Sequence, residues 1–282
     1  MALRSIPVMR ALADVKPVQQ AMPGSSVVFS IYSDLATATG TLTETSDVSS
    51  IALGNPSQVT VTLNEYGSAV TTTKKLNLTS FNDVDAALAD IIAYNAADSI
   101  DTVVSSVLTG GSNALYGGTA TGTASVTASG TMTTALIRKA VVQLRSNKAI
   151  PRIAELYAAY VHPRQSADLR AESGTGGFQE LTKYVERTPF VAGAVGALEG
   201  AYIVETPRVP SETNASSVVV YKAVVAGREA LAEALVQDTS VVIGPEIDAL
   251  RRFRTIGWYT FAGWNRLREA SLFRIETATT IN

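Results

Sequence analysis

A long helical stripe is the feature that most constrains how this chain can fold. Between residues 83 and 108 the apolar side chains recur at the spacing of one helix face. A helix over 83–108 would be about 39 Å long, at about 1.5 Å per residue. Asp83 and Asp85 favour its N-terminus through the helix dipole, and Ser80 or Asn82 can cap it. A second helix is expected over 132–146, where apolar residues again share one side.

A Thr-rich region before the first helix has β character. Val59, Val61 and Leu63 alternate with polar residues, which is the period of a strand with one apolar face. Residues 64–67, Asn-Glu-Tyr-Gly, are typical of a turn, and the run to Leu78 is then expected to return as a second strand. Such a long hairpin has little apolar mass and would be marginally stable alone, so it needs a surface to lie against.

The remaining segments predict a mixed α+β fold. Residues 1–30 carry three prolines and read as an arm. Strands are expected over 153–161, 201–206 and 218–225, and the stretch 109–130 is a loop or irregular β segment. The aromatic and arginine-rich residues 253–275 read as strands, with Gly257 and Gly263 as bends.

Composition indicates a surface that is covered by other subunits. Charged residues make up only 17% of the chain, below the roughly 25% of typical soluble proteins. Residues 1–137 carry a net charge of −5, and residues 138–282 carry +3. The two halves could attract each other between copies, although chance segregation explains the same counts. The uncharged stretch 102–137 is broken by glycines, so we expect a soluble protein without a membrane span.

No reactive group of side chains is apparent. The chain has no cysteine, which excludes disulfides and thiolate chemistry. The single histidine, His162, stands directly before Pro163, which suits the first turn of a helix. Because no partner set for a catalytic triad can be placed, we expect His162 to have a structural role at a strand-to-helix junction.

Cofactor and metal sites are not expected either. Asp83, Asp85 and Asp90 lack the spacing of a calcium loop. The glycine-rich segments 174–177 and 196–200 lack the Lys-Ser/Thr of a phosphate-binding loop. Arg251, Arg252 and Arg254 form a basic cluster that could bind phosphate, but an inter-subunit salt bridge or a solvated face is favoured. We therefore predict no catalytic, cofactor-binding or metal residues.

Five sequence segments, in this order, resemble one protein family. They are PGSSVVFSIYSDL at 23–35, NEYGSAV at 64–70, VHPRQSADLR at 161–170, GAYIVET at 200–206 and VYKAVVAGREAL at 220–231. Their order and spacing are similar to those of major capsid proteins of tailed bacteriophages with the HK97-type fold. The resemblance runs over most of the chain.

The resemblance implies a division of the chain. It implies an N-terminal arm at 1–35, an extended loop or β-hairpin at 36–79 and a peripheral domain with a spine helix at 80–149. An axial domain at 150–250 and C-terminal strands at 251–282 that return to the peripheral domain would follow. The implied function is a non-enzymatic shell protein that forms hexamers and pentamers of an icosahedral capsid around double-stranded DNA.

The resemblance also implies partners. A scaffolding protein and a portal would act during assembly, which would take place in the host cytoplasm, and a decoration protein could bind the finished virion. The arm begins almost at Met1, so a separate or previously removed scaffolding segment is expected. Some relatives join subunits through Lys–Asn isopeptide bonds, but Lys74 and Lys75 lie at the base of the predicted hairpin, so no cross-link is expected.

Other functions stay open at this point. An encapsulin-like nanocompartment shell would have the same fold around a cargo enzyme, and packaged DNA would separate the two. A soluble enzyme that uses His162 is a further alternative. A tail-tube protein is disfavoured by the two long helices.

Overall fold

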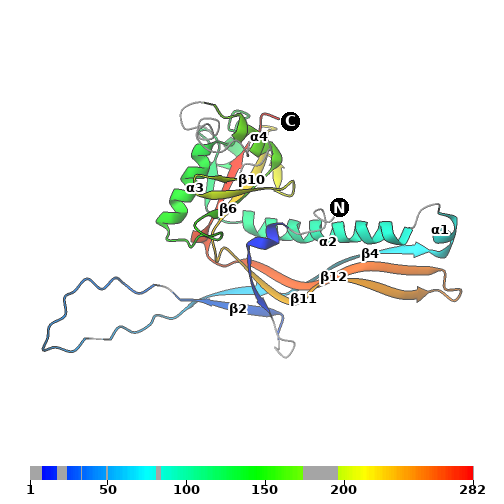
Figure 1. Cartoon of the computed structure of the whole chain (residues 1–282), viewed down its shortest axis with the longest axis horizontal. Coiled ribbons are helices and arrows are strands. Elements are labelled where there is room, and N and C mark those ends of the chain that lie inside the picture. The colour runs from blue at the N-terminus through cyan, green and yellow to red at the C-terminus, as the bar shows by residue number, and fades with distance from the viewer. Residues whose placement is uncertain are drawn as a thin grey trace.

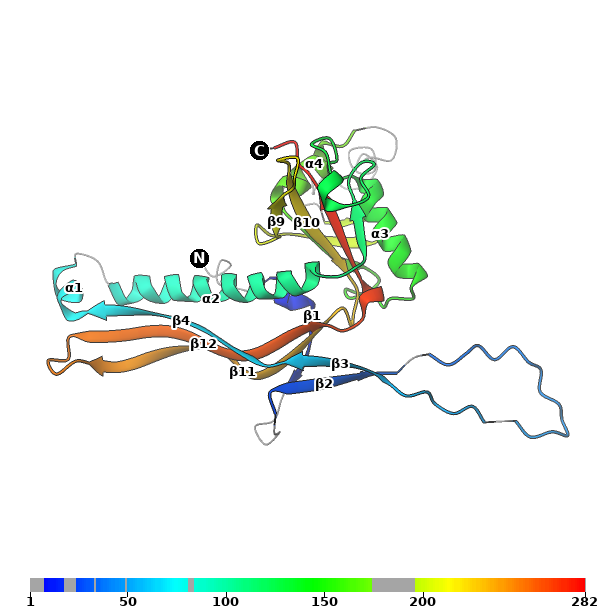
Figure 2. The ribbon, with the colours of Figure 1, turned by 180° about the vertical axis from the view of Figure 1, so that it is seen from behind.

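The computed structural model describes residues 8–17, 24–32, 34–48, 50–80, 84–173 and 196–281. Figure 1 shows a compact part, which carries α3 (Thr134–Ser146), and an elongated platform of strands along which α2 (Val84–Thr109) lies. A long loop leaves the platform at one end, and the tip of the longest strands lies at the opposite end (Figures 1 and 2).

The platform is a four-stranded sheet in the order β1-β11-β12-β4. Its long strands β11 (Leu231–Ile247) and β12 (Phe253–Arg266) pair antiparallel, β4 (Asn64–Thr73) pairs antiparallel with β12, and β1 (Ala13–Pro17) lies parallel to β11. Ile92 of α2 packs against Ile256 and Trp258 of β12, and the indole Nε1 of Trp258 donates to Asn95 Oδ1 at 2.9 Å. The helix therefore covers one face of this sheet.

Both predicted helices are confirmed. The apolar stripe of α2 is buried at Ile92, Ala96, Ile100, Val104 and Leu108. These positions recur every four residues and therefore lie on one face of the helix. The residues expected to start this helix, Asn82 and Asp83, lie outside the described residues. Helix α3 begins after Thr133, whose Oγ1 accepts a hydrogen bond from the N–H of Leu136 at 3.4 Å.

The compact part is built on a seven-stranded sheet in the order β5-β13-β10-β6-β8-β7, with β9 paired to β10. The strand predicted over 218–225 is confirmed as the central β10 (Val219–Ala226). Its Ala223 and Val225 face the core under α3, whereas Val224 and Ala226 face the C-terminal half of α2. Helices thus cover both faces of β10, which explains its nearly unbroken apolar sequence. The other strands of this sheet are β5 (Ala114–Tyr116), β6 (Tyr157–Val161), β7 (Ala197–Leu198), β8 (Ala201–Glu205), β9 (Ser211–Thr213) and β13 (Leu272–Thr277).

The predicted turn at 64–67 is wrong. The strand predicted from the alternation of Val59, Val61 and Leu63 exists as β3 (Ser57–Thr62), but it pairs antiparallel with β2 (Ser26–Ile31). Residues 64–67 begin β4, which runs straight on to pair with β12, and residues 74–79 form the short helix α1 (Lys74–Thr79) instead of a strand. The extended segment is therefore the loop 32–56 between β2 and β3, held at its root by that two-stranded ladder.

The predicted bends at Gly257 and Gly263 are also wrong, because both glycines lie inside the continuous strand β12. A Cβ at Gly263 would lie 2.1 Å from the carbonyl oxygen of Thr62, and a Cβ at Gly257 would lie 2.6 Å from that of Ser68. Neighbouring backbone thus approaches β12 closely at both positions, and that approach requires glycine.

Short elements complete the described chain. The stretch 109–130, predicted as loop or irregular β, contains only β5 and the 3-10 turn η3 (Thr123–Ser125), while η2 (Met9–Leu12) and η4 (Glu269–Ser271) precede β1 and β13. Helix α4 (Pro163–Ala171) follows β6. Among the helices in the described ranges, none combines the length and apolar character needed to cross a bilayer.

Candidate assembly surfaces

The described residues of the loop 32–56 present several apolar side chains to solvent. No helix or strand forms within its described residues, and Figure 2 shows it reaching far beyond the rest of the chain. Leu42 is 77% exposed and Ile51 is 70% exposed. The other exposed large apolar residues are Tyr32, Leu35, Val48 and Leu53. A run of exposed apolar groups of this length is typical of a surface that another molecule covers.

The root of this loop is fixed to the platform. Six consecutive residues of β2 pair with six of β3, from Ser26 with Thr62 to Ile31 with Ser57. Val27 and Val61 of this ladder pack against Ala232 and Ala234 of β11. The loop therefore projects in a direction that the sheet determines.

The opposite end of the platform carries a second exposed surface, which we call the tip. It consists of residues 241–254, where β11 turns into β12, together with residues 72–78 at the end of β4 and in α1. The predicted basic cluster lies here: Arg251, Arg252 and Arg254 line a cavity of about 130 Å³ together with Lys74. The tip also exposes large apolar side chains, namely Leu76, Leu78, Val241, Val242, Ile243, Ile247 and Leu250.

The described part of the predicted arm is anchored on its own chain. The side chain of Asp101 on α2 is fully buried and accepts hydrogen bonds from the N–H groups of Val8 and Met9 at 2.8 and 2.9 Å. It also forms an ion pair with Arg208, 2.9 Å from Nη1. Arg10 continues this anchor through the buried Glu233 of β11, with 2.6 Å between Nη2 and Oε1. This network, the arm anchor, joins arm, helix, platform and compact part.

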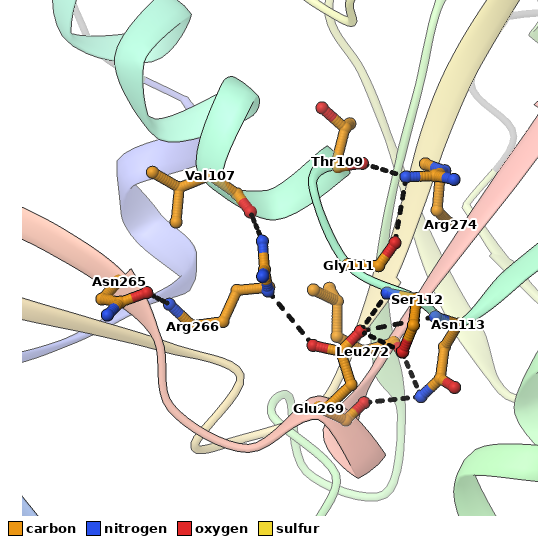
Figure 3. A network of polar contacts seen from close by, with 10 residues as sticks. All are labelled: Val107, Thr109, Gly111, Ser112, Asn113, Asn265, Arg266, Glu269, Leu272 and Arg274. Atoms are coloured by element: carbon orange, nitrogen blue, oxygen red, sulfur yellow. Dashed lines mark hydrogen bonds and ion pairs between the residues drawn. The ribbon is translucent and has the colours of Figure 1, made fainter. Parts of the chain in front are cut away.

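A second polar junction connects the end of α2 with the C-terminal strands (Figure 3). Arg266 donates through Nη1 to the carbonyl oxygen of Val107 at 2.8 Å and pairs through Nε with Glu269 at 3.1 Å. Glu269 also accepts from the N–H groups of Ser112 and Asn113, at 2.5 and 3.3 Å. Burial alone would raise the pKa of Glu269, but these bonds and the charge of Arg266 outweigh it and lower the pKa. The carboxylate therefore stays ionised and holds the junction.

His162 lies at the junction between β6 and α4, as predicted. Its ring Nδ1 accepts a hydrogen bond from the backbone N–H of Arg164 at 3.2 Å, and the backbone N–H of His162 donates to Gln165 Oε1 at 3.2 Å. The imidazole stacks on Tyr221 with 4.4 Å between ring centroids. Burial lowers the pKa of His162, and the nearby charge of Arg164 lowers it further. A neutral ring that accepts through Nδ1 is what this helix cap requires.

The other residues considered from the sequence are not brought together into a site. In the described ranges, no three carboxylate or histidine side chains lie close enough to hold a metal ion. Asp83 and the glycine-rich segment 174–177 lie outside the described residues. The segment 196–200 contains β7 and turns into β8, with positive φ at Gly196 and Gly200.

The sequence reasoning missed the buried charges of the arm anchor. Asp101 falls between Ile100 and Val104 on the apolar stripe of α2. An acidic residue on an apolar helix face is the feature of the sequence that indicates a buried, paired carboxylate. A carboxylate on a buried face needs a cation or several N–H donors, because an isolated buried charge is costly. Sequence alone does not reveal that the donors come from the arm and from Arg208.

Comparisons with known proteins agree on one family. The family model described as phage capsid protein matches residues 2–281. A search of curated protein sequences finds no significant match. The capsid of Ralstonia phage GP4 has a TM-score of 0.75 at 18% identity, covering 97% of this chain and 88% of that one. The capsid of cyanophage P-SCSP1u has a TM-score of 0.69 at 17% identity, covering 95% and 87%.

A third solved structure, titled Mycobacterium phage Che8, has a TM-score of 0.64 at 16% identity and covers 90% of this chain and 85% of that chain. These likenesses confirm the predicted capsid fold, and the family match confirms the resemblance seen in the sequence. They favour a phage capsid over a nanocompartment shell or a soluble enzyme. The chain therefore belongs to the phage capsid protein family, and it is a major capsid protein that builds the shell.

Proposed function

We propose that this chain forms hexamers and pentamers that close into an icosahedral shell around double-stranded DNA. The observation that carries the proposal is the apolar loop 32–56, which projects from a root paired to the platform and whose large apolar side chains are left exposed by the part of the chain that the structure describes. Such a segment gains stability when it lies on a neighbouring subunit. The same loop repeated around a closed symmetry would connect all subunits.

The energetics favour many modest contacts. Apolar burial contributes roughly 25 cal/mol per Å², so a contact of a few hundred Å² is worth several kcal/mol before ordering entropy is subtracted. One such contact is weak, but each subunit would make several in a closed particle. A durable shell then follows without any single strong bond.

The domain assignment belongs to this proposal. We assign the arm to 1–35, the extended loop to 36–79, the peripheral domain to 80–149, the axial domain to 150–250 and the returning C-terminal strands to 251–282. Helix α2 on the platform supports the peripheral assignment, and strands β6, β8 and β10 of the compact part support the axial one. A scaffolding protein, a portal and a decoration protein are proposed partners, assembly is proposed to take place in the host cytoplasm, and the protein is proposed to have no catalytic activity.

The experiment compares two loop variants of equal size. In the first, Leu35, Leu42, Val48, Ile51 and Leu53 are all replaced by serine. In the matched control, Thr37, Thr39, Thr41, Thr43 and Thr45 are replaced by serine. Electron microscopy and light scattering measure particle formation, and circular dichroism measures folding of the free subunit.

We expect the apolar variant to fold and fail to form shells, while the threonine variant forms them. Normal shells from the apolar variant would show that the loop does not clasp neighbours. Nuclease-protected double-stranded DNA in particles from phage is expected. Particles that enclose only protein would instead support the nanocompartment alternative.

A further inference from the structure

The two longest helices of the chain carry opposite charge. Helix α3 contains two arginines and a lysine and no acidic residue, whereas α2 contains four aspartates and no lysine or arginine. In Figures 1 and 2, α3 lies on the side of the compact part that faces away from the free length of α2. The two charged helices therefore do not meet within one chain.

The outer face of α3 combines cations with an apolar residue. It consists of Arg138, Lys139, Val142 and Arg145, which recur at the spacing of a single helix face. Val142 is 55% exposed, and the three cations are exposed as well. The buried residues of α3 lie on its other side, in the core of the compact part. This face is therefore an exposed surface of mixed basic and apolar character.

The basic charge of this face is only partly balanced by its own chain. Arg138 pairs with Glu199, with 2.8 Å between Nη2 and Oε1. No carboxylate of a described residue lies within 4.0 Å of the charged nitrogens of Lys139 or Arg145. Cations that are held close together repel one another, so this face is stabilised by contact with an acidic surface.

The outer face of α2 has the opposite character. It consists of Asp90, Ile91, Tyr94 and Asp98, which again share one side of a helix. Ile91 is 60% exposed and Tyr94 is 41% exposed, and Asp90 is exposed too. This face therefore combines acidic and apolar groups where α3 combines basic and apolar ones.

The acidic charge of the α2 face is not cancelled by the cation beside it. Arg208 pairs with Asp98 at 3.2 Å, but the same guanidinium also pairs with the buried Asp101 at 2.9 Å. One positive charge thus meets two carboxylates at this end of the face, and the net charge stays negative.

The two outer faces also match in spacing. Asp90 and Asp98 lie about 12 Å apart along α2, and Arg138 and Arg145 lie about 10.5 Å apart along α3, at about 1.5 Å per residue. Tyr94 lies midway between its two acids, and Val142 lies near the middle of the α3 face. Packed helices can therefore bring both ends into charge contact, with apolar groups between them, whichever way the helices run.

We propose that the outer face of α3 docks on the outer face of α2 in a second copy of the chain. In this contact the cations of α3 meet the acids of α2, while Val142 packs against Tyr94. The inference rests on the proposed shell function and names one contact between its subunits. Because the faces lie on different sides of the chain, each copy uses α3 on one neighbour and α2 on another. Such head-to-tail contacts close into rings when the rotation permits.

A charge-swap experiment tests this docking without breaking an ion pair within the described chain. The α3 variant carries Lys139→Glu and Arg145→Glu, the α2 variant carries Ala87→Lys and Asp90→Lys, and a third protein combines all four substitutions. The control carries Lys148→Glu and Arg228→Glu, which make the same charge change as the α3 variant at exposed positions outside the outer face. Thermal melts of the free subunits establish that each variant folds.

We expect the yield of closed particles to fall at least about tenfold in the α3 variant and in the α2 variant, because like charges would then face each other. The combined protein should recover to within about threefold of wild type, and the control should assemble normally.

A cysteine pair tests the contact directly, since the natural chain has no cysteine. The protein with Tyr94→Cys and Val142→Cys is assembled and oxidised, and its subunits are separated on a non-reducing gel. A disulfide requires Cα atoms within about 7 Å, so we expect a ladder of linked subunits. The controls carry only one of the two substitutions, and they should give no ladder.

Normal assembly of the α3 and α2 variants would overturn the docking proposal, and so would failure of the combined protein to recover or the absence of the ladder. An α3 variant that assembles normally but whose subunits lose binding to double-stranded DNA would overturn it too and assign the outer face of α3 to phosphate groups. In each of these cases shells of the wild type still support the shell function. A wild-type chain that forms no particles would refute both proposals.

Discussion

At the scale of single residues, the chain uses buried charges to hold its parts together. Asp101 and Glu233 are both fully buried, and each meets an arginine at 2.9 Å or less. Desolvating a carboxylate is costly, so such a pair is weak evidence for added stability, but breaking it leaves an unpaired buried charge. These residues therefore make the docking of the arm specific.

The arm anchor can be tested by two alanine substitutions on the same helix. Asp101→Ala removes the acceptor of the Val8 and Met9 N–H groups and one carboxylate partner of Arg208. We therefore expect the free energy of unfolding to fall by about 3–5 kcal/mol. Asp98→Ala removes a second partner of Arg208, 3.2 Å from Nε, but Asp98 is 48% exposed, so the loss should stay within about 1 kcal/mol. Urea denaturation of the unassembled subunit measures both. Equal losses of stability in the two variants would show that the Asp101–Arg208 ion pair contributes no more than an exposed one.

His162 gives the stability a pH dependence of known sign. Its folded pKa lies below the ordinary value of 6.5, mainly because of burial. As the pH falls through 6.5, the unfolded chain takes up a proton that the folded chain does not, so stability decreases until the folded pKa is reached. Above that window the group contributes no slope.

The substitution His162→Asn keeps a capping acceptor but does not titrate. We expect the wild type to lose more stability than this variant between pH 7 and pH 5.5, so that the gap between them narrows on acidification. Thermal or urea unfolding at the two pH values measures the gap. A gap that is constant across the window would mean that His162 is not buried as a neutral cap.

At the scale of elements, local periodicity in the sequence predicts whether a segment forms a helix or a strand, but it does not predict which other strand a strand pairs with. The helical stripe of α2 and the apolar run of β10 are local patterns, and both predictions are confirmed. The Asn-Glu-Tyr-Gly segment was misinterpreted as a turn, because the partners of β3 and β4 are β2 and the distant β12. A period of two identifies a strand and gives no information about which strand pairs with it.

The arm and the assembly surfaces show the same limit. Met9 and Leu12 are fully buried against α2 and the compact part, although their segment has no strong helix or strand signal in the sequence. Contacts across about ninety residues, such as that between Met9 and Asp101, cannot be derived from local spacing. The basic cluster at 251–254 could be recognised from sequence, whereas its association with Lys74 depends on the pairing of β4 with β12.

The glycines of β12 supply an element-scale prediction. Gly263→Ala places a methyl group against the backbone of Thr62 and should cost about 1–3 kcal/mol while loosening β3 at the root of the loop. The control is Gly122→Ala, where nothing lies within 4 Å of the added carbon and φ is extended at −165°. Thermal unfolding measures the cost, and hydrogen exchange over 57–62 measures the loosening. Unchanged protection there would contradict the close approach.

At the scale of the whole molecule, the chain has a shape that is incomplete alone. The compact part has helices on both faces of β10, whereas the loop and the tip expose apolar groups at opposite ends. A monomer with this distribution buries its remaining apolar surface only by contact with other molecules. The exposed apolar residues at both ends are therefore explained by contacts that form in the assembled shell.

This shape predicts how proteases distinguish free subunits from shells. A glutamate-specific protease should cut free subunits after Glu44, because that residue lies in an exposed segment without helix or strand. Trypsin is the matched control, since the segment 34–56 has no lysine or arginine to cut. In assembled shells the loop lies on a neighbour, so we expect cleavage after Glu44 to slow at least about tenfold, in line with the low population of the opened state. Mass spectrometry of the fragments measures the rate of cleavage after Glu44 in free subunits and in shells. Equal cleavage of Glu44 in free and assembled protein would show that the loop remains uncovered in the shell, and the clasping mechanism would then be wrong.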